Sequence, residues 1–232
     1  MTVYFVSAGI GGIEYLTVQA KDILTNAQVV LYDALVDKSL LDVVPIDCVL
    51  IPVGKRGGKK STAQTQINDL LIEYGRKYDR VVRLKSGDIG VFGRINEELT
   101  AIKQTQIDYQ LITGVSSALA VPLLNEILLT EKNDSRCFTI LTGHTPDTLD
   151  WSALAKIDTL VILMGGRNLP IIVENLLRGG KTPELPVAIV KNGGRDNQEV
   201  WKGTLSTIVN MTQNISLSPC IIIIGKVASG FS

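Results

Sequence analysis

Two patterns of apolar residues alternate along the chain. Short runs rich in Val, Ile and Leu, such as 3–9 (VYFVSAG) and 80–87 (RVVRLKSG), have the length and the branched side chains of buried strands. Between such runs, longer segments such as 61–78 carry apolar residues three or four positions apart, which is typical of amphipathic helices. The alternation predicts βαβ units and therefore an α/β fold with mostly parallel sheets.

The predicted elements fall into two series. Strands are expected at 3–9, 28–36, 48–55, 80–87 and 108–112, and again at 137–143, 158–165, 185–192 and 219–227. Helices are expected at 13–27, 61–78 and 170–180. Between the two series, the segment 113–118 (TGVSSA) consists of small residues that suit a connection. We therefore divide the 232 residues into an N-terminal α/β domain, 1–114, and a C-terminal α/β domain, 115–232.

The composition limits the classes of partner. Lys and Arg together number 23, as do Asp and Glu, so no overall basic field would attract nucleic acid. Apolar runs such as 220–224 are too short to span a bilayer, and the N-terminal segment lacks the pattern of a signal peptide. Three widely separated cysteines and a single histidine have no metal-ligand spacing. We expect a cytoplasmic protein that binds neither nucleic acid, membrane nor metal.

Glycines follow the first predicted strand directly. The segment 8–14 (AGIGGIE) stands between a strand and a helix, and Asp33 comes about 20 residues later, an arrangement found in dinucleotide-binding proteins. However, Glu14 stands where that motif has its third glycine. A tight strand-to-helix turn without a ligand is the alternative interpretation.

Two further segments place polar groups at strand ends. The segment 53–61 (VGKRGGKKS) combines four basic residues with glycines behind a strand, so it is either a solvated loop or a loop that binds carboxylates or phosphates. His144, the single histidine, closes the strand 137–143 and is either a satisfied polar group or a functional one. In the segment 83–94 (RLKSGDIGVFGR), three glycines indicate backbone that adopts positive φ or lies very close to a neighbouring group.

These segments, taken in order, resemble one family. The blocks YDALV (32–36), VGKRGGK (53–59), RLKSGDIGVFGR (83–94), TGVSSA (113–118) and LTGH (141–144) are similar to those of the uroporphyrinogen-III C-methyltransferases, which are tetrapyrrole methylases. The resemblance extends from Val3 to Val227. It implies two α/β domains with a cleft between them for S-adenosyl-L-methionine, and a homodimer. It also implies two methyl transfers to ring carbons of uroporphyrinogen III, giving precorrin-2 for sirohaem and cobalamin synthesis and S-adenosyl-L-homocysteine as the second product.

The resemblance also implies roles for individual residues. Asp33 matches the proposed proton acceptor of the family, and Lys55 matches the proposed proton donor. The positions that match donor-binding residues are Ile10, Ser86, Gly87, Asp88, Val91, Ser116, Ser117, Met164 and Gly193. The positions that match substrate-binding residues are Arg94, Glu97 and His144. Because the substrate carries eight carboxylates, we expect a basic rim made of Lys55, Arg56, Lys59, Lys60, Lys85 and Arg94.

The chain departs from the family pattern at several loop positions. Ile10 and Thr113 replace prolines, Gly12 replaces an acid, and Ser86, Ile89 and Gly90 differ within the usual G-G-D-P-F segment. These departures keep two alternatives open: another precorrin methyltransferase of the same family, or a donor-binding module with little catalysis. A ribosomal-RNA methylase of the same fold is disfavoured because the balanced charge provides no basic stripe.

Overall fold

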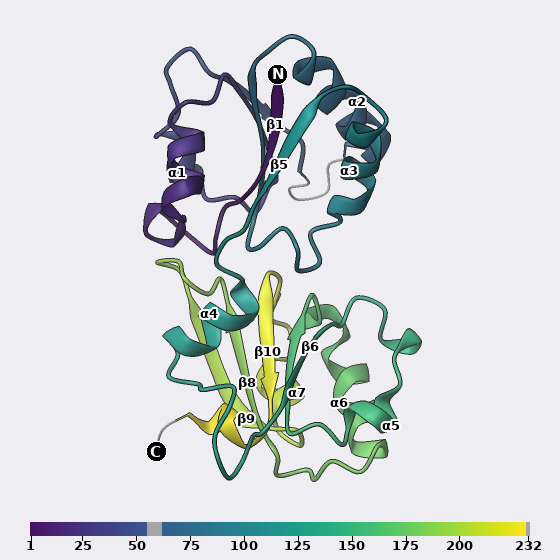
Figure 1. Ribbon diagram of the computed structural model, residues 1–232. Helices are drawn as coiled ribbons and strands as arrows, with labels where there is room; N and C mark the ends of the chain where they lie inside the picture. The colour runs from purple at the N-terminus through teal and green to yellow at the C-terminus, as the bar shows by residue number, and fades with distance from the viewer. Residues whose placement is uncertain (55–61, 231–232) are drawn as a thin grey trace. The chain divides into compact units, whose positions relative to one another are not determined.

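The computed structural model describes residues 1–54 and 62–230, and it divides into two compact units, Met1–Ser116 and Ser117–Ser232 (Figure 1). Each unit contains one five-stranded sheet with helices packed on it, so the predicted arrangement of two α/β domains is confirmed. Within the described residues, no helix is long and apolar enough to cross a membrane.

The first unit is built on a parallel sheet with the strand order β3-β2-β4-β1-β5. Its strands are β1 (Thr2–Ser7), β2 (Val29–Tyr32), β3 (Val49–Pro52), β4 (Arg80–Lys85) and β5 (Asp108–Ile112), and every strand pair is parallel. The helices are α1 (Val18–Leu24), α2 (Gln64–Gly75) and α3 (Ile95–Lys103), with short 3-10 turns at Ile13–Tyr15 and Lys38–Leu41. Figure 1 shows α1 on one face of this sheet and α2 and α3 on the other. β4, which lies at the centre, is buried from Val81 to Lys85.

The helix that the sequence predicts at 13–27 is interrupted in the structure. Ile13–Tyr15 forms a 3-10 turn, and α1 begins only at Val18. The interruption occurs because Thr17 has extended backbone and its hydroxyl accepts a hydrogen bond from the N–H of Ala20. A threonine in this position caps a new helix rather than continuing an old one.

The second unit has the strand order β6-β7-β10-β8-β9. Its strands are β6 (Phe138–Thr142), β7 (Thr159–Leu163), β8 (Pro186–Lys191), β9 (Glu199–Thr204) and β10 (Cys220–Ile224). Its helices are α4 (Ser117–Leu124), α5 (Trp151–Leu154), α6 (Leu169–Arg178) and α7 (Ile208–Met211), with 3-10 turns at Pro146–Thr148, Gly166–Asn168 and Lys226–Ser229. The core packs β7, β8 and β10 against α6, with Ile172 and Leu176 fully buried.

The strand directions in the second sheet differ from those predicted. Counted over both sheets, five of the eight strand pairs are parallel, four in the first sheet and one, β6 with β7, in the second. The other three pairs, β7–β10, β10–β8 and β8–β9, are antiparallel. The link between β8 and β9 spans only residues 192–198, which is too short for the crossover that parallel neighbours require. The sequence did not predict β9 at all, because EVWKGT lacks a run of branched residues.

Candidate active site

Loops that follow three parallel strands meet at one edge of the first sheet. Asp33 follows β2, Ser86 follows β4 and Ala8 follows β1, and the carboxyl ends of parallel strands share an edge. Gly9 and Gly87 lock two of these loops together: the N–H of Gly87 donates to the Gly9 carbonyl at 2.7 Å, and the N–H of Gly9 donates to the Gly87 carbonyl at 3.2 Å. Both glycines have positive φ, +69° and +72°.

The two glycines differ in what surrounds them. A Cβ on Gly9 would collide with the carbonyl oxygen of Tyr15, so packing inside the protein already requires a glycine there. A Cβ on Gly87 would meet nothing within 4 Å. Open space therefore lies beside the backbone at Gly87, and a ligand could approach that backbone closely. This property fits the proposed contact between 86–88 and a methyl donor.

The carboxylate of Asp88 fastens the loop after β4 to the loop after β5. Its Oδ1 accepts from the N–H of Gly90 at 2.7 Å, and its Oδ2 accepts from the Thr113 hydroxyl at 2.8 Å and from the N–H of Gly114 at 2.9 Å. Partial burial raises the pKa of Asp88, but these hydrogen bonds outweigh it and hold the pKa below its ordinary value. The Thr113 hydroxyl thus supplies one of the three hydrogen bonds that this carboxylate accepts.

Arg83 lies at the centre of a buried charged network. The side chain is 1% exposed and uses all five of its N–H groups. Nε and Nη2 donate to the two carboxylate oxygens of Glu98, both at 3.1 Å. Nη2 also donates to Oδ1 of Asp33 at 2.6 Å, and Nη1 donates to the carbonyls of Leu31 and Leu84 at 3.5 and 3.3 Å. Arg83 therefore has no N–H left for a ligand.

Lys85 completes the network. Its Nζ donates to Oε1 of Glu98 at 2.8 Å and lies 3.8 Å from Oδ2 of Asp33. The Lys85 side chain is only 6% exposed, so the prediction that it belongs to a basic rim is wrong. It faces inward because residues 83 and 85 lie on the same side of β4, which packs against α3. Asp33, by contrast, keeps 31% of its side chain exposed.

The sequence reasoning missed Glu98. This residue lies in the first turn of α3, is 1% exposed at its side chain and forms ion pairs with both Arg83 and Lys85. A signal was present: two cations on one face of a buried strand require a buried anion close by. Glu97, which the sequence selected instead, is 49% exposed and pairs with Arg94 at 2.8 Å. Both members of this pair lie at the start of α3, where Arg94 has a positive φ of +52°.

The other predicted donor-binding residues of the first unit lie around the same loops. Ile10 is buried, 5% exposed, directly after Gly9. Ser86 and Val91 are half-buried, and the N–H of Val91 closes a turn on the carbonyl of Asp88 at 3.1 Å. Ser116, also half-buried, ends the unit.

Lys55 lies outside the described residues, as do Arg56, Lys59 and Lys60. Gly54, which precedes Lys55 in the sequence, backs directly onto Asp33 and Ala34: a Cβ on Gly54 would collide with the backbone of both. The end of β3 is therefore held against the turn that carries Asp33.

In the second unit, three predicted site residues follow three strands of common direction. His144 comes after β6, Met164 after β7 and Gly193 after β8, so they share one edge of that sheet. His144 is exposed, and Asn168 holds its loop by donating to the carbonyls of residues 143 and 144 at 2.7 and 3.1 Å. Met164 is 50% exposed with a φ of +57°, a backbone strain that is common at functional sites.

Packing explains one of the glycines in the second unit. A Cβ on Gly193 would collide with the side chain of Val121, so a glycine there allows α4 to pack against the loop after β8. Ser117, the first residue of α4, is half-buried. The structure thus gives Gly193 a packing role that exists without any ligand.

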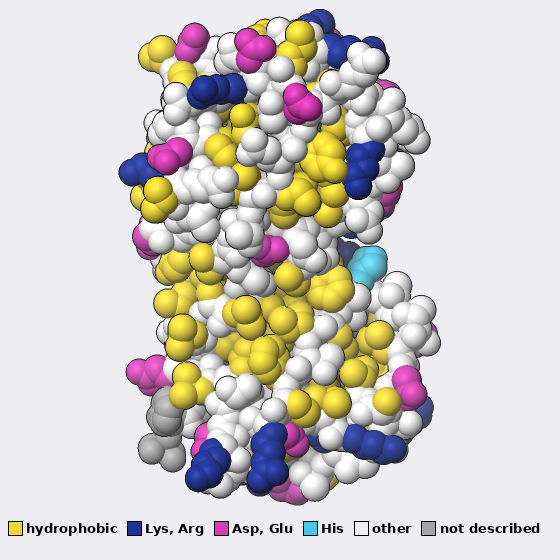
Figure 2. Space-filling view, in the orientation of Figure 1, with side chains coloured by type: hydrophobic (Ala, Val, Ile, Leu, Met, Phe, Trp, Pro, Cys, Tyr) yellow, Lys and Arg dark blue, Asp and Glu magenta, His cyan; other side chains and the backbone are white. Residues whose placement is uncertain are grey.

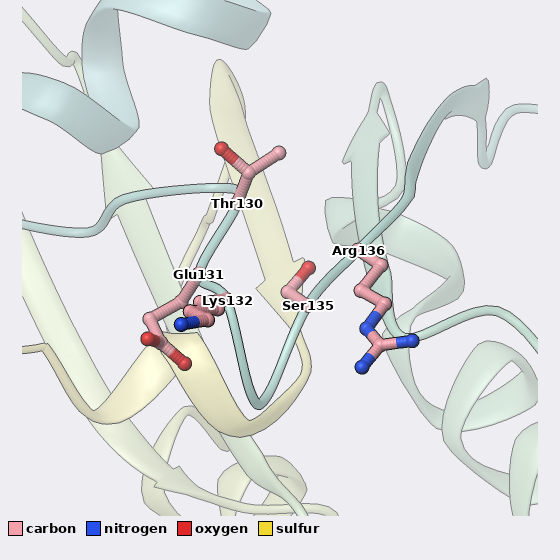
Figure 3. Close-up of a pocket in the computed structure, with 5 residues that line it drawn as sticks. All are labelled: Thr130, Glu131, Lys132, Ser135 and Arg136. Carbon is pink, nitrogen blue, oxygen red and sulfur yellow. The ribbon is translucent and has the colours of Figure 1, made fainter.

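A surface pocket in the second unit contains none of the predicted site residues. It is lined by Thr130, Glu131, Lys132, Ser135 and Arg136, and Figure 3 shows the Arg136 side chain directed away from Glu131 and Lys132. Its polar groups do not converge on a common point. Within the described residues, no group of three or more His, Cys, Asp or Glu side chains could hold a metal ion.

Residues 2–209 match the family model described as "Tetrapyrrole (Corrin/Porphyrin) Methylases". The chain belongs to the tetrapyrrole methylases. Among other tetrapyrrole methylases, it is 47% identical to the uroporphyrinogen-III C-methyltransferase of Synechococcus elongatus, over 97% of this chain and 93% of the relative. It is 38% identical to the S-adenosyl-L-methionine-dependent uroporphyrinogen III methyltransferase of Methanosarcina barkeri, over 97% and 91%.

A solved tetrapyrrole methylase has the same fold. The uroporphyrin-III C-methyltransferase of Thermus thermophilus, in complex with S-adenosyl homocysteine, superimposes with a TM-score of 0.86 at 32% identity over 100% of both chains. The family predicted from the sequence motifs is confirmed.

Proposed function

We propose that this tetrapyrrole methylase is an S-adenosyl-L-methionine-dependent uroporphyrinogen-III C-methyltransferase. It transfers methyl groups to two ring carbons and gives precorrin-2 for sirohaem or cobalamin synthesis. Relatives with this name match over nearly the whole chain. The observation that carries the proposal is a partly exposed carboxylate, Asp33, on the same sheet edge as a glycine loop with open space beside its backbone.

The donor supplies a methyl group that is already activated, so the protein has mainly to bind and align. We propose that the backbone of 86–88 binds the donor, since Gly87 leaves room there. The side chain of Asp88 holds the loop in place through its hydrogen bonds. Ile10, Val91, Ser116, Ser117, Met164 and Gly193 complete the proposed donor set. Alignment of this kind lowers a reaction barrier by roughly 7–11 kcal/mol.

Asp33 is proposed to stabilise the positive charge that methyl transfer creates on the macrocycle. The bond between the methyl carbon and sulfur breaks with its electron pair on sulfur, and the ring carbon forms the new bond, so the macrocycle gains a positive charge and must lose a proton. The side chain of Asp33 stabilises that charge and accepts the proton. Lys55 is proposed as the proton donor, which is supported by the contact of the preceding Gly54 with Asp33.

Arg94, Glu97 and His144 are proposed to bind the substrate. Arg94 suits this role because its side chain is 71% exposed and a guanidinium binds carboxylates with two hydrogen bonds. The eight carboxylates of uroporphyrinogen III are suitable partners for this guanidinium.

We also propose that the protein is a cytoplasmic homodimer. Leu119, Leu123 and Leu124 of α4 are 50%, 62% and 49% exposed, and Figure 2 shows hydrophobic side chains gathered on this face of the second unit. Apolar groups gathered in this way typically mark an interface. The three cysteines are free, as expected in a reducing compartment.

A methylation assay tests the function. The protein is incubated with S-adenosyl-L-methionine and either uroporphyrinogen III or precorrin-2, and the products are identified by mass. We expect two added methyl groups on uroporphyrinogen III only, and an Asp33→Asn variant that still binds donor but forms little product. Methylation of precorrin-2 alone would indicate a later enzyme of the pathway, and donor binding without any product would indicate a binding module.

A further inference from the structure

We propose that Glu98 is a positioning residue for methyl transfer: it holds Arg83 and Lys85 so that these two cations orient Asp33. This inference rests on the proposed function, because it assigns a role to a residue that acts through Asp33.

Four of the five N–H groups of Arg83 bind inside the protein core, and the fifth binds Asp33. Two of its N–H groups are taken by the carboxylate of Glu98 and two by the carbonyls of Leu31 and Leu84. The fifth holds Oδ1 of Asp33 at 2.6 Å. Because both oxygens of Glu98 accept hydrogen bonds from the guanidinium, the guanidinium cannot rotate without losing several hydrogen bonds. The orientation of the Glu98 carboxylate therefore determines, through the guanidinium of Arg83, the orientation of the Asp33 carboxylate.

Glu98 also acts on the second oxygen of Asp33. The ammonium group of Lys85 lies 2.8 Å from Oε1 of Glu98 and 3.8 Å from Oδ2 of Asp33. Glu98 thus holds the cation near the oxygen that Arg83 does not contact. Because Asp33 is the network member with substantial exposure, 31%, Oδ2 is the oxygen that can face a substrate.

Charge balance explains why Glu98 and not a neutral residue occupies this site. Arg83 and Lys85 of β4 face Asp33 after β2 and Glu98 on α3, so two positive charges meet two negative ones. Among residues 1–54 and 62–230, the other side chain in hydrogen-bonding contact with Glu98 is the uncharged amide of Gln64 on α2, at 3.5 Å. Removing Glu98 leaves one excess positive charge, and removing Lys85 leaves one excess negative charge.

Stability alone does not account for the network. Well-packed apolar side chains stabilise a core as well as or better than buried ions do, because burying a charge is costly. Here the charged groups converge on Asp33, a partly exposed carboxylate at the sheet edge where the loops meet. That convergence is expected of groups that orient a reactive side chain.

The test compares the pH dependence of kcat for uroporphyrinogen III methylation among Glu98→Gln, Lys85→Met and the double variant. We expect the acid limb of Glu98→Gln to move by about one pH unit to lower pH, because excess positive charge favours ionised Asp33. Lys85→Met should move it to higher pH by a similar amount. The double variant restores neutrality and should return the limb close to that of the wild type. Glu98→Gln should also lower kcat at least about tenfold, because Asp33 is no longer oriented.

Controls separate positioning from a loss of fold. Glu73→Gln removes an exposed acid of α2 that pairs with Lys77, and its pH profile should match that of the wild type. Donor affinity, measured by calorimetry, should stay within about twofold in every variant, because the network does not include the donor loop. If Glu98→Gln does not fold, the step from Lys85→Met to the double variant isolates the effect of Glu98: a limb that returns to the wild-type pH supports the proposal, and one that stays at the Lys85→Met position overturns it.

The outcomes are distinct. Limbs that move in opposite directions for the two single variants, with compensation in the double variant, support the positioning role. Limbs that stay at the wild-type pH, or that move in the same direction, overturn it while leaving the proposed function intact. A folded wild type that forms no methylated uroporphyrinogen III overturns the proposed function and this inference together.

Discussion

Two arginine–glutamate pairs of the first unit contrast sharply. Arg83 and Glu98 are each 1% exposed and share two hydrogen bonds of 3.1 Å. Arg94 and Glu97 are 71% and 49% exposed and share one contact of 2.8 Å. The two glutamates are consecutive in the sequence, and successive residues on an α-helix point about 100° apart. One turn of α3 thus directs Glu98 into the sheet and Glu97 into solvent.

The contrast shows that distance alone does not rank ion pairs. The shorter contact is the exposed one, where water and dissolved salt screen the attraction and the net contribution to stability is small. The longer contacts are buried, where an unpaired partner cannot be solvated by water. The buried pair therefore matters for the structure of the first unit, whereas the role of the exposed pair in substrate binding stays a proposal.

The largest expected effect is on stability. Arg83→Met should lower the free energy of unfolding by about 3–5 kcal/mol, because Glu98 is left as a buried carboxylate with one cation fewer. The matched Arg94→Met should change it by less than about 1 kcal/mol, because its partner stays solvated. Urea unfolding of the two variants measures the difference, and equal losses would remove the distinction between the pairs.

The next effect is on binding. Arg94→Ala should weaken binding of uroporphyrinogen III by roughly 10–100-fold, the value of a charge-assisted hydrogen bond of about 1.5–3 kcal/mol. Donor affinity should be unchanged. Arg178→Ala, which removes an equally exposed arginine paired with Glu174 on α6, is the control and should leave both affinities unaltered. Titration of each ligand separates the two affinities, and an equal loss for substrate and donor would contradict the assignment of Arg94.

The smallest expected effect concerns Asp88, whose carboxylate is more exposed than that of Glu98 and less exposed than that of Glu97. Asp88→Asn should cost about 1–2 kcal/mol near neutral pH, because an amide nitrogen cannot accept the hydrogen bonds donated to that oxygen. Since the folded protein lowers the pKa of Asp88, its carboxylate stabilises the fold above the ordinary pKa of an aspartate. That contribution disappears as the pH falls through the lowered pKa.

Unfolding at a series of pH values checks this prediction. The difference between wild type and Asp88→Asn should shrink on acidification. A difference that stays constant down to the acid range would mean that the charge of Asp88 contributes nothing.

The sequence predicted the buried strands well, and the reason is local. An interior strand such as β7 is apolar over most of its length, and β5 lies at 108–112 as expected. β9 was missed because it is stabilised by pairing with β8 rather than by an apolar run of its own. The predicted helix at 13–27 was too long because the capping role of Thr17 depends on its backbone conformation.

For the candidate site, too, the sequence predicted local features but not those that depend on tertiary contacts. Motifs identified Asp33 and the glycine loop, since the order of residues at strand ends is a property of the sequence. They misplaced Lys85 at the surface and overlooked Glu98, since burial depends on which helix covers the strand. The role of Lys55 stays a prediction, as do the donor and substrate contacts.

The sequence by itself determined the family, most of the strands, and the position of the motif residues relative to the strand ends. These features depend on residues close together in the chain. The tertiary structure alone decided that Asp33, Arg83 and Glu98 form one network. Their meeting requires β2 to lie beside β4 and α3 to turn one particular face towards that strand, and both conditions arise from contacts between distant parts of the chain.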